Sequence, residues 1–324
     1  MRVLLTDYDM TDLSIEEQVF GEAGIELVAA QCRTAAEVIQ RSEGCSALLV
    51  QYAPIGAEVF DARPGIGICS KIGAGYDTID VAEASRRGIW VANSPDYGIG
   101  EVASHALAML LDAARCITRY DRDIHDGTWN YASVPPLRRP ASLTVGILGL
   151  GRIGKRFAHL ARNVFGSIIA CDPYLIDGDF PPYVGRVGLD ELFERSDAIA
   201  IHCPLSDETR GLVGGRLLRL MRPGGYLVNT ARGGIVDVDA LLEVLREGRL
   251  AGVGLDVLPD EPIPAGHPLL ADRRVLLSPH AAFYSDEADV ELRRKAAMNI
   301  VDWMRHGRPG YPVNAGSRRH DGRG

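Results

Sequence analysis

The sequence predicts an α/β protein built from two doubly wound domains. Short apolar runs alternate with amphipathic stretches along the chain, a pattern typical of strands and helices around parallel sheets. The length of 324 residues is about twice that of a common single domain. A polar, Pro-rich segment at 126–140 precedes a second series of apolar runs. Each series is long enough for a sheet of its own.

The composition is that of an ordinary globular protein. Hydrophobic residues make up 46% and charged residues 24%, values close to the average for soluble domains. The net charge is −8 and no basic run could follow a phosphate backbone, so we expect no nucleic-acid partner. No apolar run approaches the roughly 18–20 residues of a membrane helix, and the first residues lack the pattern of a signal peptide. We therefore expect a cytoplasmic protein without a membrane partner.

The six cysteines form no CxxC pair. Most of them lie inside apolar, strand-like runs, where a cysteine acts as a small hydrophobic residue. We therefore expect neither disulfides nor a bound metal.

The first series of apolar runs predicts five strands. They are expected at 2–6, 25–30, 47–50, 66–72 and 89–92. A helix is predicted over 14–22, and Ser14 and Glu17 have the spacing of a capping box at its start. These elements would form a small doubly wound domain.

The second series predicts six strands behind a long apolar helix at 100–117. The strands are expected at 144–149, 168–172, 198–203, 226–230, 252–257 and 275–278. A helix at 286–305 follows when this set is complete, so we expect it to return to the first domain. The tail at 315–324 is polar and Gly-rich and is expected to be disordered.

A glycine motif joins the first strand of the second series to a helix expected at 155–164. Gly149 permits a tight turn, Gly151 lets the backbone approach a pyrophosphate, and Gly154 allows close packing of helix on strand. The phosphates would lie at the amino end of the helix, where Arg152 and Ile153 also present backbone amides. The motif, in this context, predicts dinucleotide binding.

Asp172 ends the next strand, 18 residues after Gly154. A carboxylate there can accept hydrogen bonds from a ribose 2′-hydroxyl and would repel a 2′-phosphate. Residues 173–175 supply no Arg, so the sequence predicts NAD; the alternative is a surface Asp in a turn before Pro173. The domains are then a Rossmann NAD-binding domain at 99–287, inserted in a flavodoxin-like substrate-binding domain at 1–98 and 288–324.

Three further motifs follow strands of the second domain, namely Asn229-Thr-Ala-Arg232-Gly-Gly, Asp256-Val-Leu-Pro-Asp-Glu261-Pro and Ser278-Pro-His280-Ala-Ala. With Lys71-Ile-Gly-Ala-Gly-Tyr-Asp-Thr-Ile-Asp80 in the first domain, their order resembles the D-2-hydroxyacid dehydrogenases over nearly the whole chain. The likeness is greatest to the C-terminal-binding-protein branch, in 172–175, 229–234 and 279–285. Eukaryotic co-repressors of that branch carry Trp where this chain has Phe283, and a long tail that this sequence lacks.

The resemblance implies reversible hydride transfer between NADH and a small 2-oxo acid, with Arg232, Glu261 and His280 as catalytic residues. Reduction places a hydride on the carbonyl carbon and a proton on its oxygen. His280 would donate that proton, because an imidazole titrates near neutrality. Glu261 would hydrogen-bond the far ring nitrogen and favour the protonated ring. Arg232 would hold the substrate carboxylate with its planar guanidinium.

The resemblance implies further contacts. Backbone amides at Ala74 and Gly75 would bind the substrate carboxylate, and Lys71 and Phe283 would lie near the substrate. For Lys71, and for Gln51 on a neighbouring strand, a solvated surface position is the alternative. His105, on the apolar helix, is expected to be a packed interdomain histidine.

The remaining cofactor contacts lie after strands of the second domain. Asp256 would meet the nicotinamide end of the cofactor, and a helix cap is the alternative role for Thr209. The other expected contacts are Cys203, Pro204, Thr230 and Ala231.

Two function classes fit these motifs. The first is an NAD-dependent D-2-hydroxyacid dehydrogenase, and the alternative is an NAD-sensing regulatory protein of the C-terminal-binding-protein kind. A formate dehydrogenase is disfavoured because that branch lacks a carboxylate at the position of Glu261. Family members are usually homodimers, and 120–140 is the segment expected to form the dimer arm.

Overall fold

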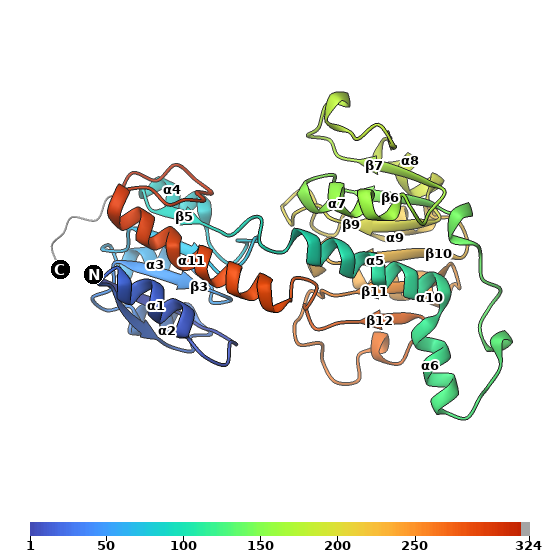
Figure 1. Cartoon of the computed structure of the whole chain (residues 1–324), viewed down its shortest axis with the longest axis horizontal. Coiled ribbons are helices and arrows are strands. Elements are labelled where there is room, and N and C mark those ends of the chain that lie inside the picture. Colours follow the sequence, from blue (N-terminus) through green and yellow to red (C-terminus); the bar gives the residue numbers. More distant parts are fainter. Residues whose placement is uncertain (319–324) are drawn as a thin grey trace. The chain divides into compact units, whose positions relative to one another are not determined.

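The computed structural model describes residues 1–318 and divides into two compact units, each described by itself. Unit 1 is Met1–Tyr97 together with the chain from Ser285 onward, and unit 2 is Gly98–Tyr284 (Figure 1). These divisions differ by one and three residues from the predicted boundaries after 98 and 287. Within the described residues, no helix is both long and apolar enough to cross a membrane.

Unit 1 contains a five-stranded parallel sheet in the order β2-β1-β3-β4-β5. The strands are β1 (Arg2–Leu5), β2 (Glu26–Ala29), β3 (Ala47–Val50), β4 (Ile68–Lys71) and β5 (Trp90–Ala92). This is the strand order of flavodoxin-like folds. All residues of β3, β4 and β5 are buried, as expected for strands covered on both faces.

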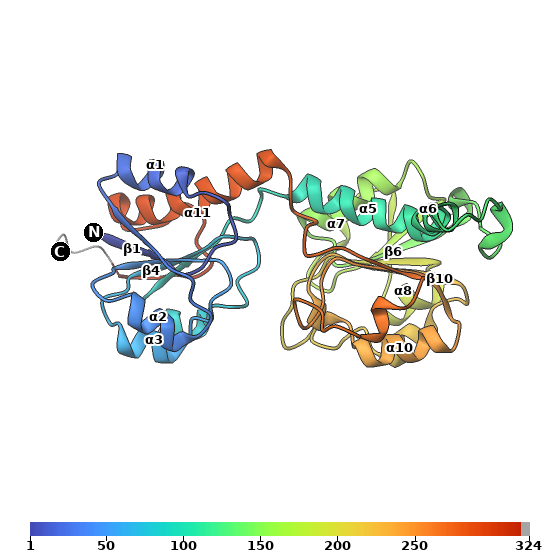
Figure 2. The ribbon, with the colours of Figure 1, turned by 90° about the horizontal axis from the view of Figure 1, so that it is seen from below.

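Helices cover both faces of this sheet. They are α1 (Ser14–Glu22), α2 (Ala35–Arg41), α3 (Ala57–Ala62), α4 (Val81–Arg86) and α11 (Asp286–His306). Figure 2 shows α1 and α11 on one face and α2 and α3 on the other. The helix α11 packs on α1 and β4, so the predicted return of the chain to the first domain is confirmed.

The predicted capping box at Ser14 is wrong. Ser14 is already the first helical residue, and its hydroxyl donates to Asp12 and accepts no N–H of the helix. A capping box occurs instead on α2, where Thr34 accepts from the Glu37 backbone and Glu37 accepts from the Thr34 backbone.

The end of the described chain is ordered against unit 1. Val313 donates its backbone N–H to Val91 at 2.8 Å, and the indole nitrogens of Trp90 and Trp303 both donate to the carbonyl oxygen of Arg318. The prediction of disorder is therefore wrong for residues 315–318, because the two indoles and the edge of β5 supply partners that composition does not show. The rest of that prediction falls on 319–324, outside the described residues.

Unit 2 contains a seven-stranded parallel sheet in the order β12-β11-β10-β9-β6-β7-β8. The strands are β6 (Thr144–Leu148), β7 (Ser167–Cys171), β8 (Val184–Arg186), β9 (Ala198–Ile201), β10 (Gly225–Asn229), β11 (Leu250–Leu255) and β12 (Val275–Leu277). The first six in chain order have the Rossmann arrangement, and β12 extends it. The sequence missed β8, which has three residues and buries one of them.

Helices of unit 2 form layers on both faces of this sheet (Figure 2). They are α5 (Ile99–Arg115), α6 (Ile117–His125), α7 (Arg152–Ala161), α8 (Leu189–Arg195), α9 (Gly215–Leu220) and α10 (Val238–Arg246). Short 3₁₀ turns occur at Tyr131–Ser133, Pro140–Ser142, Asp177–Asp179, Gly233–Ile235 and Pro268–Leu270. The predicted helix at 100–117 stops at Arg115, because Cys116 adopts a left-handed φ of 53° and separates α5 from α6.

Candidate active site

The turn between β6 and α7 can be built only with glycine at two of its positions. Gly149 has a φ of +92°, and a Cβ there would lie 2.5 Å from the backbone nitrogen of Cys203. A Cβ at Gly154 would lie 2.2 Å from the carbonyl oxygen of Gly149. A Cβ at Gly151 would meet nothing within 4 Å, so this position faces open space. The turn thus leaves room for a phosphate to approach its backbone.

The amino end of α7 is suited to an anion. Its N-cap is Gly151, and no side chain caps the first turn, which contains Arg152 and Ile153. Free backbone N–H groups at a helix start attract phosphates. Thr230, after β10, has a buried hydroxyl without a hydrogen-bond partner in the described chain, as expected where a bound molecule supplies one. These residues fit a dinucleotide.

Asp172 lies directly after β7 and beside the glycine turn. One carboxylate oxygen accepts the N–H of Leu150 at 2.8 Å, and the other accepts the N–H of Tyr174 at 3.1 Å. The hydroxyl of Tyr174 donates to Glu208, and this hydrogen bond raises the pKa of Tyr174. The carboxyl groups of Asp172 and Glu208 therefore both lie near the end of β7.

The loop after β9 is tied together by Thr209. Its hydroxyl donates to the carbonyl of Pro204 at 2.6 Å and accepts the N–H of Ser206 at 2.8 Å. The alternative of a helix cap is wrong, because the next helix, α9, begins only at Gly215. Thr209 shapes the loop that follows the buried Cys203.

Arg232 is presented by a turn after β10. The side-chain amide of Asn229 donates to the carbonyl of Arg232 at 2.9 Å and accepts the N–H of Ala231 at 3.0 Å. A Cβ at Gly233 would lie 1.9 Å from the carbonyl carbon of Leu258. The Arg232 turn therefore packs directly on the backbone that leads to Glu261.

Glu261 and His280 form the polar centre of the site. Oε2 of Glu261 lies 2.7 Å from Nδ1 of His280, and Oε1 accepts the N–H of Leu258 at 2.9 Å. Burial raises the pKa of Glu261, but the hydrogen bonds from His280 and Leu258, with the charges of His280 and Arg232, outweigh it and lower the pKa. Glu261 is thus an ionised acceptor at neutral pH. It fixes the proton on Nδ1 and leaves Nε2 of His280 available.

The loop that carries His280 is organised by Asp256. His280 has a left-handed φ of 56°, and its N–H donates to the carbonyl of Asp256 at 2.8 Å. The two carboxylate oxygens of Asp256 accept the N–H groups of Ala281 at 2.9 Å and Ala282 at 3.0 Å. Sequence reasoning missed this role and that of Asn229, although a polar residue directly after a buried strand signals both. The nicotinamide contact of Asp256 stays a prediction.

Lys71, Ala74 and Gly75 belong to unit 1. Lys71 ends β4 and is 6% exposed, so the alternative of a solvated position is wrong for it, as it is for the buried Gln51. Nζ of Lys71 lies 5.6 Å from the ring centre of Tyr52. The side-chain amide of Asn93 donates to the carbonyl of Ala74 at 2.6 Å, which fixes the glycine-rich loop. The substrate contacts of these residues, and of Phe283 in unit 2, stay predictions.

Comparisons with known proteins agree with this geometry. The family profile described as D-isomer specific 2-hydroxyacid dehydrogenase, NAD binding domain, matches residues 107–282. A glyoxylate reductase of Korarchaeum cryptofilum is 40% identical over 283 residues, which cover 86% of this chain and 85% of that protein. The chain belongs to the D-isomer-specific 2-hydroxyacid dehydrogenase family.

Solved structures of dehydrogenases and reductases share the fold over nearly their whole length. An NADPH-dependent glyoxylate/hydroxypyruvate reductase of Sinorhizobium meliloti, in complex with NADP and malonate, has a TM-score of 0.88 and 29% identity, covering 98% of each chain. A D-lactate dehydrogenase of Aquifex aeolicus, complexed with NAD and lactic acid, has a TM-score of 0.85 and 25% identity, covering 93% of this chain and 95% of that one.

The predicted fold class and family are thereby confirmed. The dehydrogenase is an oxidoreductase that acts on the CH–OH group of 2-hydroxy acids and has a nicotinamide-cofactor domain. The narrower likeness to the C-terminal-binding-protein branch stays a prediction.

Proposed function

We propose that the dehydrogenase uses NADH to reduce a small 2-oxo acid to the D-2-hydroxy acid, and that it also runs the reverse reaction. The observation that carries this proposal is the 2.7 Å contact between Glu261 and His280. The backbone that leads to Glu261 also packs against the turn of Arg232. This arrangement provides a proton donor, its charge partner and an anion-binding cation in one unit.

Each residue has a distinct task. Bound NADH supplies the hydride. His280 gives the proton on Nε2 to the carbonyl oxygen of the substrate, and Glu261 balances the positive charge that the ring carries before transfer. Arg232 binds the substrate carboxylate through its guanidinium, which orients the neighbouring carbonyl. The reverse reaction uses neutral His280 as the base.

The residues around Asp172 support NADH over NADPH. The Asp172 carboxylate is held by two backbone N–H groups, and Glu208 adds a second carboxylate through its bond to Tyr174. Residues 173–175 include no Arg, so nothing in this stretch would balance a 2′-phosphate. The Sinorhizobium relative uses NADPH, and the preference for NADH therefore rests on the residues of this chain.

Glyoxylate and hydroxypyruvate are the first substrates to test, because relatives at 40% and 32% identity are named as their reductases. The purified protein is mixed with NADH and a panel of 2-oxo acids, and NADH oxidation is followed by absorbance at each concentration. We expect saturable oxidation of NADH with at least one small 2-oxo acid, and formation of the D-enantiomer wherever the product is chiral, as with hydroxypyruvate. NADH binding without oxidation by any acid would contradict the proposal and favour the NAD-sensing regulatory protein.

We also propose a homodimer whose arm includes α6 and the segment after it. Ile117 and Ile124 are exposed on α6, and Trp129 and Tyr131 are 87% and 88% exposed. Figure 1 shows this part projecting from the body of unit 2. Large apolar side chains gathered at a surface are typical of an interface. Light scattering should give the mass of two chains, and Trp129→Ser with Tyr131→Ser should give one. The cytoplasmic location stays a prediction.

A further inference from the structure

A chain of polar contacts runs from α5 to the loop that carries His280. Nε2 of His105 lies 3.0 Å from Oγ of Ser278, and that oxygen lies 2.5 Å from Oδ1 of Asp256. His105 is on α5, Ser278 follows β12, and Asp256 follows β11. The three residues thus connect a helix to the ends of two neighbouring strands within unit 2.

The direction of these hydrogen bonds follows from the donors and acceptors. Both oxygens of Asp256 already accept backbone N–H groups, so the carboxylate acts as an acceptor toward Ser278. A serine hydroxyl has a single proton, and Ser278 donates it to Asp256. Its oxygen then accepts from His105, which must carry a proton on Nε2. The same nitrogen lies 3.7 Å from Oδ1 of Asp256. A proton on Nε2 would therefore also be attracted by the carboxylate of Asp256.

These contacts oppose the local preference of the backbone. His280 adopts a φ of 56°, in the left-handed region that is unfavourable for residues other than glycine. The bonds to Asp256 from His280, Ala281 and Ala282 hold the loop in this shape. The orientation of the Asp256 carboxylate therefore decides where the His280 ring lies, and Ser278 fixes that orientation through Oδ1.

We propose that His105 is a positioning residue for His280 and acts through Ser278 and Asp256. When His105 donates, the Ser278 hydroxyl has one favoured rotamer and stays directed at Asp256. Without this donor the hydroxyl can turn to other acceptors, Asp256 loses a partner, and the 280–282 loop opens more often. His280 then spends less time in contact with Glu261. The effect on catalysis rests on the proposed function, whereas the effect on the loop does not.

Three substitutions separate this role from simple packing. His105→Leu removes the donor, and His105→Gln places an amide nitrogen near the position of Nε2 and keeps it. His159→Leu is the matched control, since His159 is an exposed histidine on α7 of the same unit. For each protein, kcat and KM are measured with the best 2-oxo acid, and hydrogen exchange is measured on a peptide that contains Ala281 and Ala282.

We expect His105→Leu to lower kcat about tenfold, the order of effect of a misplaced catalytic group, while KM for NADH changes little. His105→Gln should recover most of kcat, and His159→Leu should match the wild type. The amides of Ala281 and Ala282 should exchange faster in His105→Leu than in the wild type, His105→Gln or His159→Leu. If that variant does not fold, His105→Asn, whose amide is too short to reach Ser278, takes its place.

A double variant tests the connection through Ser278. Ser278→Ala should lower kcat as His105→Leu does, and the double variant should be no slower than Ser278→Ala, because both act on one network. The proposal would be overturned if the fold-losses in kcat of the two single variants multiplied in the double variant. It would also be overturned if kcat and the exchange rates of His105→Leu matched those of the wild type. If none of the 2-oxo acids makes the wild type oxidise NADH, the proposed function is refuted instead. The exchange rates of Ala281 and Ala282 would still decide the role of His105.

Discussion

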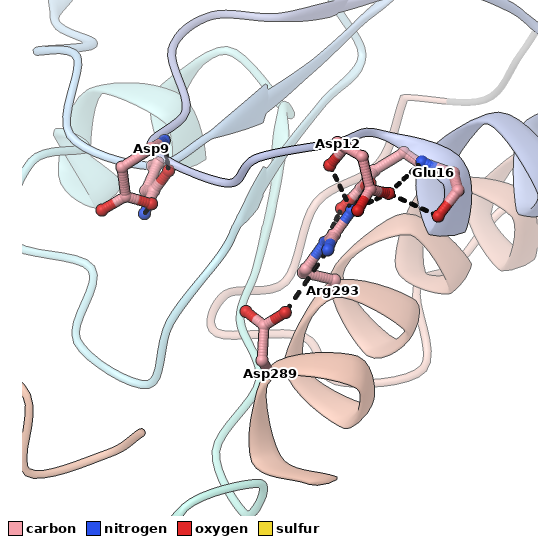
Figure 3. A network of polar contacts seen from close by, with 7 residues as sticks. Asp9, Asp12, Glu16, Asp289 and Arg293 are labelled. Atoms are coloured by element: carbon pink, nitrogen blue, oxygen red, sulfur yellow. Dashed lines mark hydrogen bonds and ion pairs between the residues drawn. The ribbon is translucent and has the colours of Figure 1, made fainter. Parts of the chain in front are cut away.

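The guanidinium of Arg293 and the carboxylate of Glu16 form a two-point ion pair inside unit 1. Nε lies 2.8 Å from one carboxylate oxygen and Nη2 lies 2.6 Å from the other, and both side chains are buried. Figure 3 shows Asp12 and Asp289 at the same guanidinium. The hydrogen bonds to Glu16 raise the pKa of Arg293. The ion pair therefore links α11, the last helix described, to α1, the first helix of the chain.

Removing one charge of this pair should destabilise unit 1 strongly. Glu16→Leu leaves Arg293 buried without its main partner, and we expect a loss of about 3–5 kcal/mol in the free energy of unfolding. The double variant Glu16→Leu with Arg293→Met should regain most of the lost free energy of unfolding, because no buried charge is then uncompensated. Urea denaturation followed by circular dichroism measures both. Arg195→Ala, which breaks an exposed pair with Glu191, is the control and should cost under about 1 kcal/mol. A double variant as unstable as Glu16→Leu would contradict this prediction.

Substitutions of His280 and Glu261 should have different effects on rate. His280→Ala removes the proton donor and should reduce kcat by roughly 10²–10⁴-fold, with little change in NADH binding. Glu261→Gln removes a charge that favours protonated His280. Because reduction needs that protonated form, the alkaline limb of the pH–rate profile should move to lower pH. Stopped-flow rates across pH 5–10 would measure this, and an unmoved limb would show that Glu261 does not tune His280.

His202 should make the folded protein sensitive to acid. Both ring nitrogens are buried and have no hydrogen-bond partner among residues 1–318. The ring centre lies 5.0 Å from that of Phe157, and burial lowers the pKa of His202 from 6.5 to about 3. Between these values the unfolded chain binds a proton that the folded protein does not. Stability is therefore full above the unfolded value of 6.5 and is lost as pH falls toward 3.

The measurement compares wild type with His202→Phe. From pH 7 to pH 5 the wild type should lose about 2 kcal/mol more free energy of unfolding than His202→Phe. His159→Phe, at an exposed histidine, should keep the slope of the wild type. Parallel curves for wild type and His202→Phe would mean that His202 finds a partner or solvent when the pH is lowered.

Local sequence patterns predicted the elements that local physics decides. Apolar runs marked eleven of the twelve strands in the part of the chain that the structure describes, because a buried parallel strand needs continuous apolar residues. Gly149 and Gly154 were assigned correctly to the tight turn and to the close packing of helix on strand, since only glycine fits these positions. The three-residue strand β8 was missed because it buries a single residue, Val184.

Contacts between distant segments could not be predicted in the same way. Asp256 and Ser278 are 22 residues apart in the sequence, and nothing in either segment shows that their side chains meet. The carbonyl of Arg318 is ordered by Trp90 and Trp303, whereas composition alone suggested disorder. Even Ser14, whose spacing to Glu17 matches a capping box, prefers Asp12 because helix α1 starts one residue earlier than that motif requires.

Asp172 should set the choice of cofactor. Its carboxylate is fixed by the N–H groups of Leu150 and Tyr174, so it cannot turn away from an approaching 2′-phosphate without losing both bonds. We expect kcat/KM with NADH to exceed that with NADPH at least about tenfold, which corresponds to about 1.4 kcal/mol. Asp172→Ala should narrow this gap, and Glu208→Gln should narrow it less. Equal use of both cofactors by the wild type would contradict the prediction.

Lys71 should favour substrates with a polar or acidic distal end. The amides of the 73–75 loop are expected to bind one carboxylate of the substrate, and Lys71 ends the strand just before that loop. We therefore expect its ammonium to meet a second polar or acidic group of the substrate. Lys71 is 6% exposed and lies 5.6 Å from the ring centre of Tyr52, where a charge pair is screened less than at the surface. Such a pair is worth about 1.5–3 kcal/mol, or roughly one to two decades in kcat/KM. Lys71→Met should therefore impair an acidic 2-oxo acid by that amount and an alkyl one of equal length hardly at all. Equal losses for both acids, or none, would make Lys71 a structural residue.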